Sequence, residues 1–164
     1  MTLHQILRRG SLFAPLKAAE RQVLEQALCV RRYPRGYRFT EQGKRADAMY
    51  LIIEGQITLQ QHVEGSTQRS RHKTLRPGTA IGLVSMIDNG PATATSRARG
   101  TVTVASLPRD AFMLLVSTRA EIGRHFQQMV ARQLDRQIHL SVRRTTSALS
   151  KHDGHAIRTS AEQH

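Results

Sequence analysis

The sequence contains no tryptophan, a single cysteine and no long apolar run, and each of these absences excludes a class of protein. One cysteine, Cys29, allows neither an internal disulfide nor a cysteine-based metal set. No apolar stretch approaches the roughly 18 residues of a membrane-spanning helix, and no signal peptide with an apolar centre and a cleavage site begins the chain. We therefore expect a soluble, cytoplasmic protein of one domain, with no membrane partner.

Acidic residues are scarce relative to basic ones: 25 Lys and Arg face 12 Asp and Glu, which gives a net charge of +13. Such an excess attracts nucleic acid, acidic proteins or anionic ligands. With no Trp, three Tyr and four Phe, the chain has few of the aromatic side chains on which a stacking platform for single-stranded nucleic acid depends. We therefore expect a solvated basic surface without specific nucleic-acid binding. The excess of Arg over Lys suggests a GC-rich, bacterial genome.

Short apolar or alternating runs, separated by turn residues, occupy residues 30–107, and helical periodicity flanks them. A helix is predicted over residues 12–28, with Pro15 as its first helical position. Many short strands at this spacing indicate a small antiparallel barrel or roll. The sequence predicts strands over residues 48–53, 56–60 and 101–107, a polar hairpin tip over residues 64–73, and a short helix over residues 108–116.

A longer helix is predicted over residues 119–142. Its apolar residues recur every four positions, so the apolar stripe winds around the helix. One end can then pack on the roll while Val130, Leu134 and Ile138 face a second subunit, which predicts a homodimer. The alternative is a single core helix with a frayed end. Residues 143–164 are polar and without period, and we expect a disordered tail.

The segment PGTAIGLVSMIDNGPATATSRA, residues 77–98, is built like a loop that wraps a phosphate, yet it carries almost no charge. Its three glycines let a ligand approach the backbone closely. Residues 83–87 suit one short helix, whose first amide groups would point into the hollow. Between Gly78 and Ser96 the only ionisable side chain is Asp88, which would repel a phosphate.

Residues 36–43, 47–55, 75–78 and 81–82 together resemble the cyclic nucleotide-binding domain. That family includes the catabolite activator protein, the regulatory subunits of protein kinase A and cyclic nucleotide-gated channels. The resemblance implies a mainly β fold, an antiparallel and jelly-roll-like β-roll with an N-terminal helix and a long C-terminal helix. The domain would cover residues 12–142.

In the family, residues 81–95 would form the phosphate-binding cassette, and two of its polar roles are lost here. The glutamate that takes the ribose 2′-hydroxyl falls on Leu83, and the arginine that pairs with the cyclic phosphate falls on Ala92. The lost charge pair weakens binding by about 2–5 kcal/mol, and the lost ribose contact by about 1 kcal/mol or more. Arg97 and Arg99, which share a strand face, could replace the cation only if that face points inward. We expect neither cyclic AMP nor cyclic GMP to bind tightly, and no cofactor.

The vestigial pocket is expected to persist as architecture, with apolar side chains filling the space that a nucleotide occupies in relatives. Its expected lining is Gly82, Leu83, Val84, Ser85, Ala92, Thr93 and Ala94.

No enzyme or metal site is indicated by the sequence. Ser85 lacks the second glycine of a nucleophile elbow. His152 and His155 have the spacing H-x-x-H, but they stand in the polar tail without a rigid frame for a metal. The spacing of Arg132 and Asp135 occurs in some cyclic dinucleotide sites, and an ordinary i,i+3 ion pair explains it equally well.

No helix-turn-helix, channel or kinase segment is indicated after Val142. We therefore expect a stand-alone, non-enzymatic regulatory module that acts through a protein partner, an acidic one being the choice that its charge favours. The alternative is a signalling sensor that binds cyclic AMP, cyclic GMP or a cyclic dinucleotide such as c-di-GMP through non-standard residues. The sequence identifies neither the partner nor the pathway.

Overall fold

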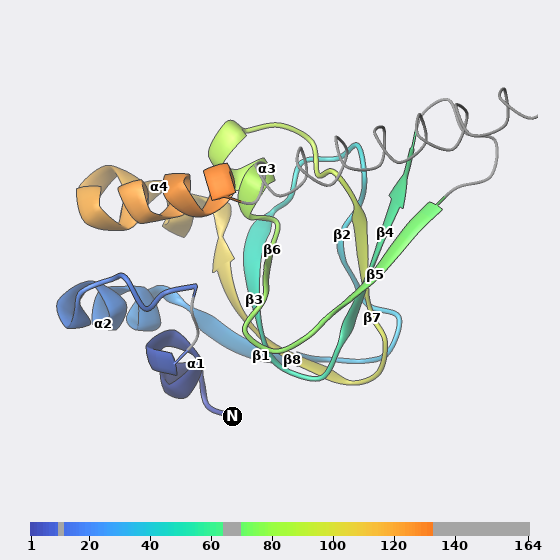
Figure 1. The fold of residues 1–164 in the computed structure, drawn as a ribbon, viewed down its shortest axis with the longest axis horizontal. Helices are drawn as coiled ribbons and strands as arrows, with labels where there is room; N and C mark the ends of the chain where they lie inside the picture. Colours follow the sequence, from blue (N-terminus) through green and yellow to red (C-terminus); the bar gives the residue numbers. More distant parts are fainter. Residues whose placement is uncertain (10–11, 64–69, 133–164) are drawn as a thin grey trace, which may run out of the picture. The chain divides into compact units, whose positions relative to one another are not determined.

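The structure, a computed structural model, describes residues 1–9, 12–63 and 70–132, and it divides the chain into a unit of residues 1–128 and a unit of residues 129–164. Two four-stranded antiparallel sheets form a β-roll, with strand orders β1-β8-β3-β6 and β2-β7-β4-β5 (Figure 1). This confirms the predicted mainly β fold. The strands are β1 (Cys29–Tyr33), β2 (Arg38–Thr40), β3 (Ala48–Glu54), β4 (Ile57–His62), β5 (Ser70–Leu75), β6 (Ala80–Ile81), β7 (Thr95–Ala98) and β8 (Val102–Pro108).

The helices α2 and α4 lie at the same end of the roll (Figure 1). The helices are α1 (Leu3–Arg9), α2 (Ala18–Ala27), α3 (Leu83–Asp88) and α4 (Arg109–Thr118). A further helix occupies residues 120–132. The described residues end at 132. The rest of the predicted long helix, which includes Leu134 and Ile138, and the predicted tail lie outside them.

The prediction of a helix from residue 12 is wrong, because Pro15 lies in a turn and α2 begins at Ala18. The Leu16 N–H donates to the Phe13 carbonyl at 3.1 Å. The Arg21 guanidinium donates to the Leu16 carbonyl at 2.5 Å and so holds this turn against α2. The Phe13 side chain in this turn is completely buried.

Strand β3 is buried on both faces, as its unbroken apolar run predicts. Tyr50 and Ile52 belong to the hydrophobic cluster inside the roll. Met49 and Leu51, on the opposite face, have no exposed surface, and both α3 and α4 contact the strand. β3 therefore connects the interior of the roll with the helices outside it.

The polar segment after β4 was predicted as a hairpin tip over residues 64–73, which is too wide. β5 begins at Ser70 and pairs with β4 from Ser70 to Leu75, while residues 64–69 are not among the described ones. Opposed residues share a face of the sheet, so Lys73, opposite Leu59, lies on the face that packs against the core.

Candidate functional site

The segment that corresponds to the phosphate-binding cassette runs from β6 through α3, and the predicted short helix is confirmed as Leu83–Asp88. Gly82 precedes the helix with a φ of +80°, in the left-handed region. A Cβ at this position would lie 2.6 Å from the Ala48 carbonyl oxygen of β3. Only glycine therefore allows the entry to α3 to approach β3 so closely.

Ser85 ties the cassette together through its hydroxyl group. The side chain is 2% exposed. Its Oγ accepts a hydrogen bond from the Ala46 N–H at 2.9 Å and donates to the Gly90 carbonyl at 2.5 Å. The hydroxyl thus joins the cassette to the segment before β3, with both its hydrogen-bonding roles occupied by backbone groups, which gives Ser85 a structural role.

The two positions where the family resemblance places a glutamate and an arginine are both buried. Leu83 is 3% exposed and Ala92 is 8% exposed. The backbone of Ala92 is held on both sides, since its N–H donates to the Lys44 carbonyl at 2.8 Å and its carbonyl accepts from the Gly43 N–H at 2.9 Å. Of the other expected lining residues, Val84 is half-buried, Ala94 is buried and Thr93 is exposed.

Thr40 and Ser96 form a buried hydroxyl pair that the sequence analysis did not anticipate. The Thr40 N–H donates to Ser96 Oγ at 3.1 Å, and the Thr40 hydroxyl donates to the Ala94 carbonyl at 3.0 Å. The two hydroxyl oxygens lie 2.7 Å apart. These residues are 56 positions apart in the sequence, so no local pattern indicates the pair. Its hydrogen bonds are made within the protein, where they hold β2 against β7.

Arg97 does not supply the missing cation from inside the roll. It lies opposite Arg38 and Thr58, on the face of β7 that points away from buried Ser96, and its side chain is exposed. The same outer surface carries Glu41, and the hydrogen bond from Lys44 lowers the pKa of the Glu41 carboxyl. Arg99 follows the strand, is exposed, and donates to Gln56 Oε1 at 3.4 Å.

Two cations on β5 occupy the core-facing side of the sheet instead. Lys73 lies opposite Leu59, and Arg71 lies opposite Gln61. Leu59 packs against the hydrophobic cluster of the roll, and alternation puts Arg71 on the same face one step further along. Both basic side chains are exposed, because β5 is an edge strand.

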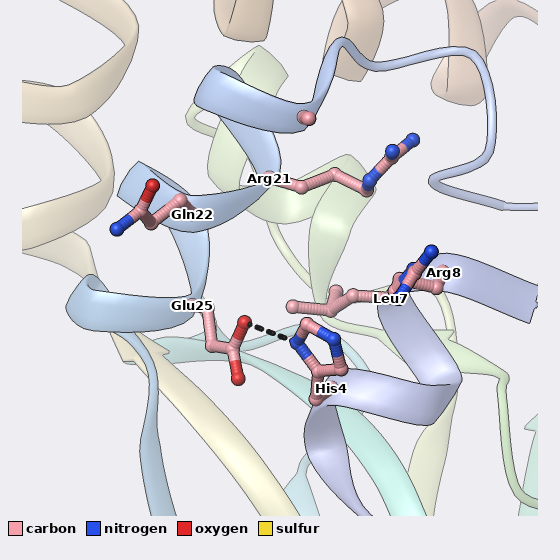
Figure 2. A pocket seen from close by; sticks show the side chains of 7 residues that line it. His4, Leu7, Arg8, Arg21, Gln22 and Glu25 are labelled. Atoms are coloured by element: carbon pink, nitrogen blue, oxygen red, sulfur yellow. Dashed lines mark hydrogen bonds and ion pairs between the residues drawn. The ribbon is translucent and has the colours of Figure 1, made fainter.

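A hollow of about 400 Å³ lies between α1 and α2 and contains no cassette residue (Figure 2). The His4 Nδ1 lies 3.0 Å from the Glu25 Oε2 across it. Arg21 is already engaged with backbone carbonyls, and the Glu25 carboxylate would oppose an anion. The hollow is lined by His4, Leu7, Arg8, Ala18, Arg21, Gln22 and Glu25.

Three further observations concern the other predicted features. Within the described ranges, no group of three His, Cys, Asp or Glu side chains is placed to hold a metal ion. No helix of the part of the chain that the structure describes is long and apolar enough to cross a membrane. Val130, the one residue of the predicted dimer seam that is described, is 7% exposed in the single chain.

Residues 30–119 match the family model of the cyclic nucleotide-binding domain. A CRP-like cAMP-activated global transcriptional regulator of Mycobacterium tuberculosis is 25% identical over 134 residues, which cover 82% of this chain and 59% of the regulator. A cAMP-dependent protein kinase regulatory subunit of Aspergillus fumigatus is 33% identical over 119 residues, 72% of this chain and 28% of that subunit.

Among solved structures, the Thermus thermophilus catabolite activator protein is similar with a TM-score of 0.70 and 25% identity, over 82% of this chain and 62% of that one. The chain thus spans less than two thirds of the length of each of these three relatives. Both sequence relatives carry the names of regulatory proteins.

Proposed function

Since the chain belongs to the cyclic nucleotide-binding domain family, we propose that it is a non-enzymatic regulatory module whose cassette no longer binds cyclic nucleotides tightly and which acts through a protein partner. No cofactor is required for this role.

The observation that carries the proposal is the burial of apolar side chains at the two polar positions of the cassette. Leu83 and Ala92 are 3% and 8% exposed. A ribose hydroxyl placed against Leu83 would lose its water without gaining an acceptor, and a phosphate near Ala92 would lack the guanidinium that relatives place at this position. Because Arg97 faces outward, the next strand supplies no replacement.

A protein partner is supported by charge and by the regulatory relatives. The net charge of +13 favours an acidic surface on that partner. With apolar residues in the cassette, the roll would fold without a nucleotide, so binding of the partner would not depend on nucleotide occupancy.

Isothermal titration calorimetry with cyclic AMP and cyclic GMP tests the loss of ligand. We expect no dissociation constant below about 10 μM for the wild type, and a tighter value would overturn the proposal. The double variant Leu83→Glu, Ala92→Arg restores the two charges and is expected to gain affinity. Leu83→Glu with Thr93→Arg is the matched control, because Thr93 is an exposed neighbour. Ala92→Arg alone serves as the second variant if the double variant does not fold.

A second candidate function is a sensor that binds a phosphate-bearing ligand, such as a cyclic dinucleotide, through non-standard residues. Lys73 and Arg71 favour it, because both lie on the core-facing side of β5. Calorimetry with c-di-GMP on the wild type and on Arg71→Gln, Lys73→Gln separates the two candidates. Micromolar binding that the double variant loses would favour the sensor, and no binding by the wild type would exclude c-di-GMP as its ligand.

A further inference from the structure

Two arginines converge on one neutral oxygen at the end of the cassette helix. Asn89 follows α3 with a φ of 57° and a ψ of 21°, a left-handed conformation that asparagine tolerates. Its Oδ1 accepts a hydrogen bond from the Arg45 guanidinium and another, at 3.1 Å, from Arg109 Nη1. Arg45 precedes β3 and Arg109 begins α4, so three separate segments meet at this oxygen.

Among the residues that the structure describes, no carboxylate forms an ion pair with Arg45 or Arg109. In the described ranges, the ion pairs within 4.0 Å involve other cations. The carboxylate of the adjoining Asp88 accepts the Gly90 N–H at 2.8 Å. A guanidinium has five N–H donors, and exposed Arg45 uses one of them on Asn89. Donors therefore remain for a carboxylate, whose two oxygens match the guanidinium geometry.

The helix that carries Arg109 also exposes two large apolar side chains. Met113 is 53% exposed and Leu114 is 65% exposed, while Phe112 and Leu115 form the buried face of α4. Met113 is four residues after Arg109, so the two are neighbours on the helix surface. Met113 thus places exposed apolar surface next to Arg109, and Leu114 extends that surface by about 100° round α4, so the surface is of mixed character.

We propose that the surface formed by Arg45, Arg109, Met113 and Leu114 docks an acidic segment of a partner protein. A carboxylate of the segment binds the arginine pair, and an apolar side chain next to it packs on Met113 and Leu114. The inference rests on the proposed function, which requires a protein partner, and it gives that partner a chemistry. Charge complementarity with a chain of net charge +13 selects the acidic segment as the occupant.

The docked segment would contact the C-terminal end of the cassette helix α3 and the first residue of α4. Asn89 is the C-terminal cap of α3, and Arg109 is the first residue of α4. Arg109 also donates to the Ala46 carbonyl at 2.6 Å and to the Ser85 carbonyl at 3.4 Å. A carboxylate at this point would therefore act on the hydrogen bonds that join α4 to the cassette.

Selection from a random 12-residue peptide display library on the full chain tests the surface. Enriched peptides are expected to carry Asp or Glu next to Leu, Phe or Met. Their dissociation constants, measured by fluorescence anisotropy, are expected to weaken about tenfold for Arg45→Gln, Arg109→Gln. Met113→Ser, Leu114→Ser is expected to weaken the same peptides.

The control Arg97→Gln, Arg99→Gln removes the same charge from exposed positions elsewhere and should leave the affinity within about twofold. Because Arg109 makes structural hydrogen bonds, Arg45→Gln alone is the variant that leaves the fold intact. Peptides without acidic residues, binding indifferent to Arg45, or no enrichment at all would each overturn the proposal. Tight binding of cyclic AMP would instead overturn the proposed loss of ligand and leave this surface standing.

Discussion

Replacing Leu83 by glutamate places a carboxylate in a position that the structure describes as closed to water. The Leu83 side chain is 3% exposed, so its removal forfeits about 1.5–3 kcal/mol of burial free energy. The introduced carboxyl group must then be neutral in the folded chain. Bringing a carboxyl of ordinary pKa, about 4.3, to its neutral form at pH 7 costs about 4 kcal/mol. The loss in unfolding free energy at pH 7 is therefore expected to reach about 5–7 kcal/mol.

The pH dependence separates these two contributions. The folded chain retains a proton that the unfolded chain releases above about pH 4.3, so the variant loses stability as the pH rises, by about 1.4 kcal/mol per unit. Near pH 4 only the loss of burial remains. Urea denaturation followed by circular dichroism, from pH 4 to pH 7, measures the difference from the wild type.

Two matched variants make the result specific. In Leu83→Gln the introduced side chain has nearly the shape of glutamate but does not titrate, so the destabilisation of this variant should be independent of pH. Val84→Glu changes a half-buried neighbour and should show a smaller loss with a weaker slope. If Leu83→Glu is as stable as the wild type at every pH, the side chain reaches solvent, and the description of an apolar, closed cassette is wrong.

Three other predictions concern the Ser85 hydroxyl, the Tyr50 phenol and the oligomeric state. Ser85→Ala leaves the buried Ala46 N–H without its acceptor and should lower the unfolding free energy, measured by urea denaturation, by about 1–3 kcal/mol. An unchanged unfolding free energy would contradict the structural role of the hydroxyl. Burial raises the pKa of Tyr50 to about 12, so the stabilising contribution of the neutral phenol is present below about pH 10 and is lost as the pH rises toward 12. Tyr50→Phe should remove the phenolate absorbance change near pH 12, and an unchanged titration curve would contradict this assignment. Light scattering of the wild type is expected to give a mass of twice 18.4 kDa, and Leu134→Asp is expected to give a monomer. A monomeric wild type would end the dimer prediction.

The elements that could be predicted from the sequence are those with a strong local pattern. The unbroken apolar run of β3 and the glycine-bounded helix α3 each have one, and both were placed within one residue of their observed bounds. A strand with Arg97 and Arg99 is predicted after the cassette, but not its bounds: β7 ends at Ala98, and its four residues, TSRA, alternate between buried and exposed positions without apolar bulk. Helix α1 was missed as well, since its seven residues are too few for a clear period.

The arrangement of the site could not be predicted, because it is built from contacts between distant segments. The side chain of Asn89 meets Arg45 and Arg109, which are 44 and 20 positions away in sequence. The orientation of Arg97 depends on which neighbouring residue of β7 turns inward, and buried Ser96 decides it by pairing with Thr40. Neither the meeting of the two arginines at Asn89 nor the orientation of Arg97 can be read from the sequence. The apolar residues Leu83 and Ala92, in contrast, are visible in the sequence by comparison with the family.

The pairing of β1 with β8 has a consequence for how the chain is synthesised. Ser106 Oγ donates to the Cys29 carbonyl across 77 positions of sequence, and His125 Nε2 reaches the Leu12 carbonyl across 113. A ribosome that adds about 5–20 residues per second needs about 4–15 s to proceed from β1 to β8. During that interval β3 has emerged without the strand that covers its edge. An unpaired apolar strand edge is a template for pairing with another chain, so misassociation of the nascent chain is most favoured during this interval.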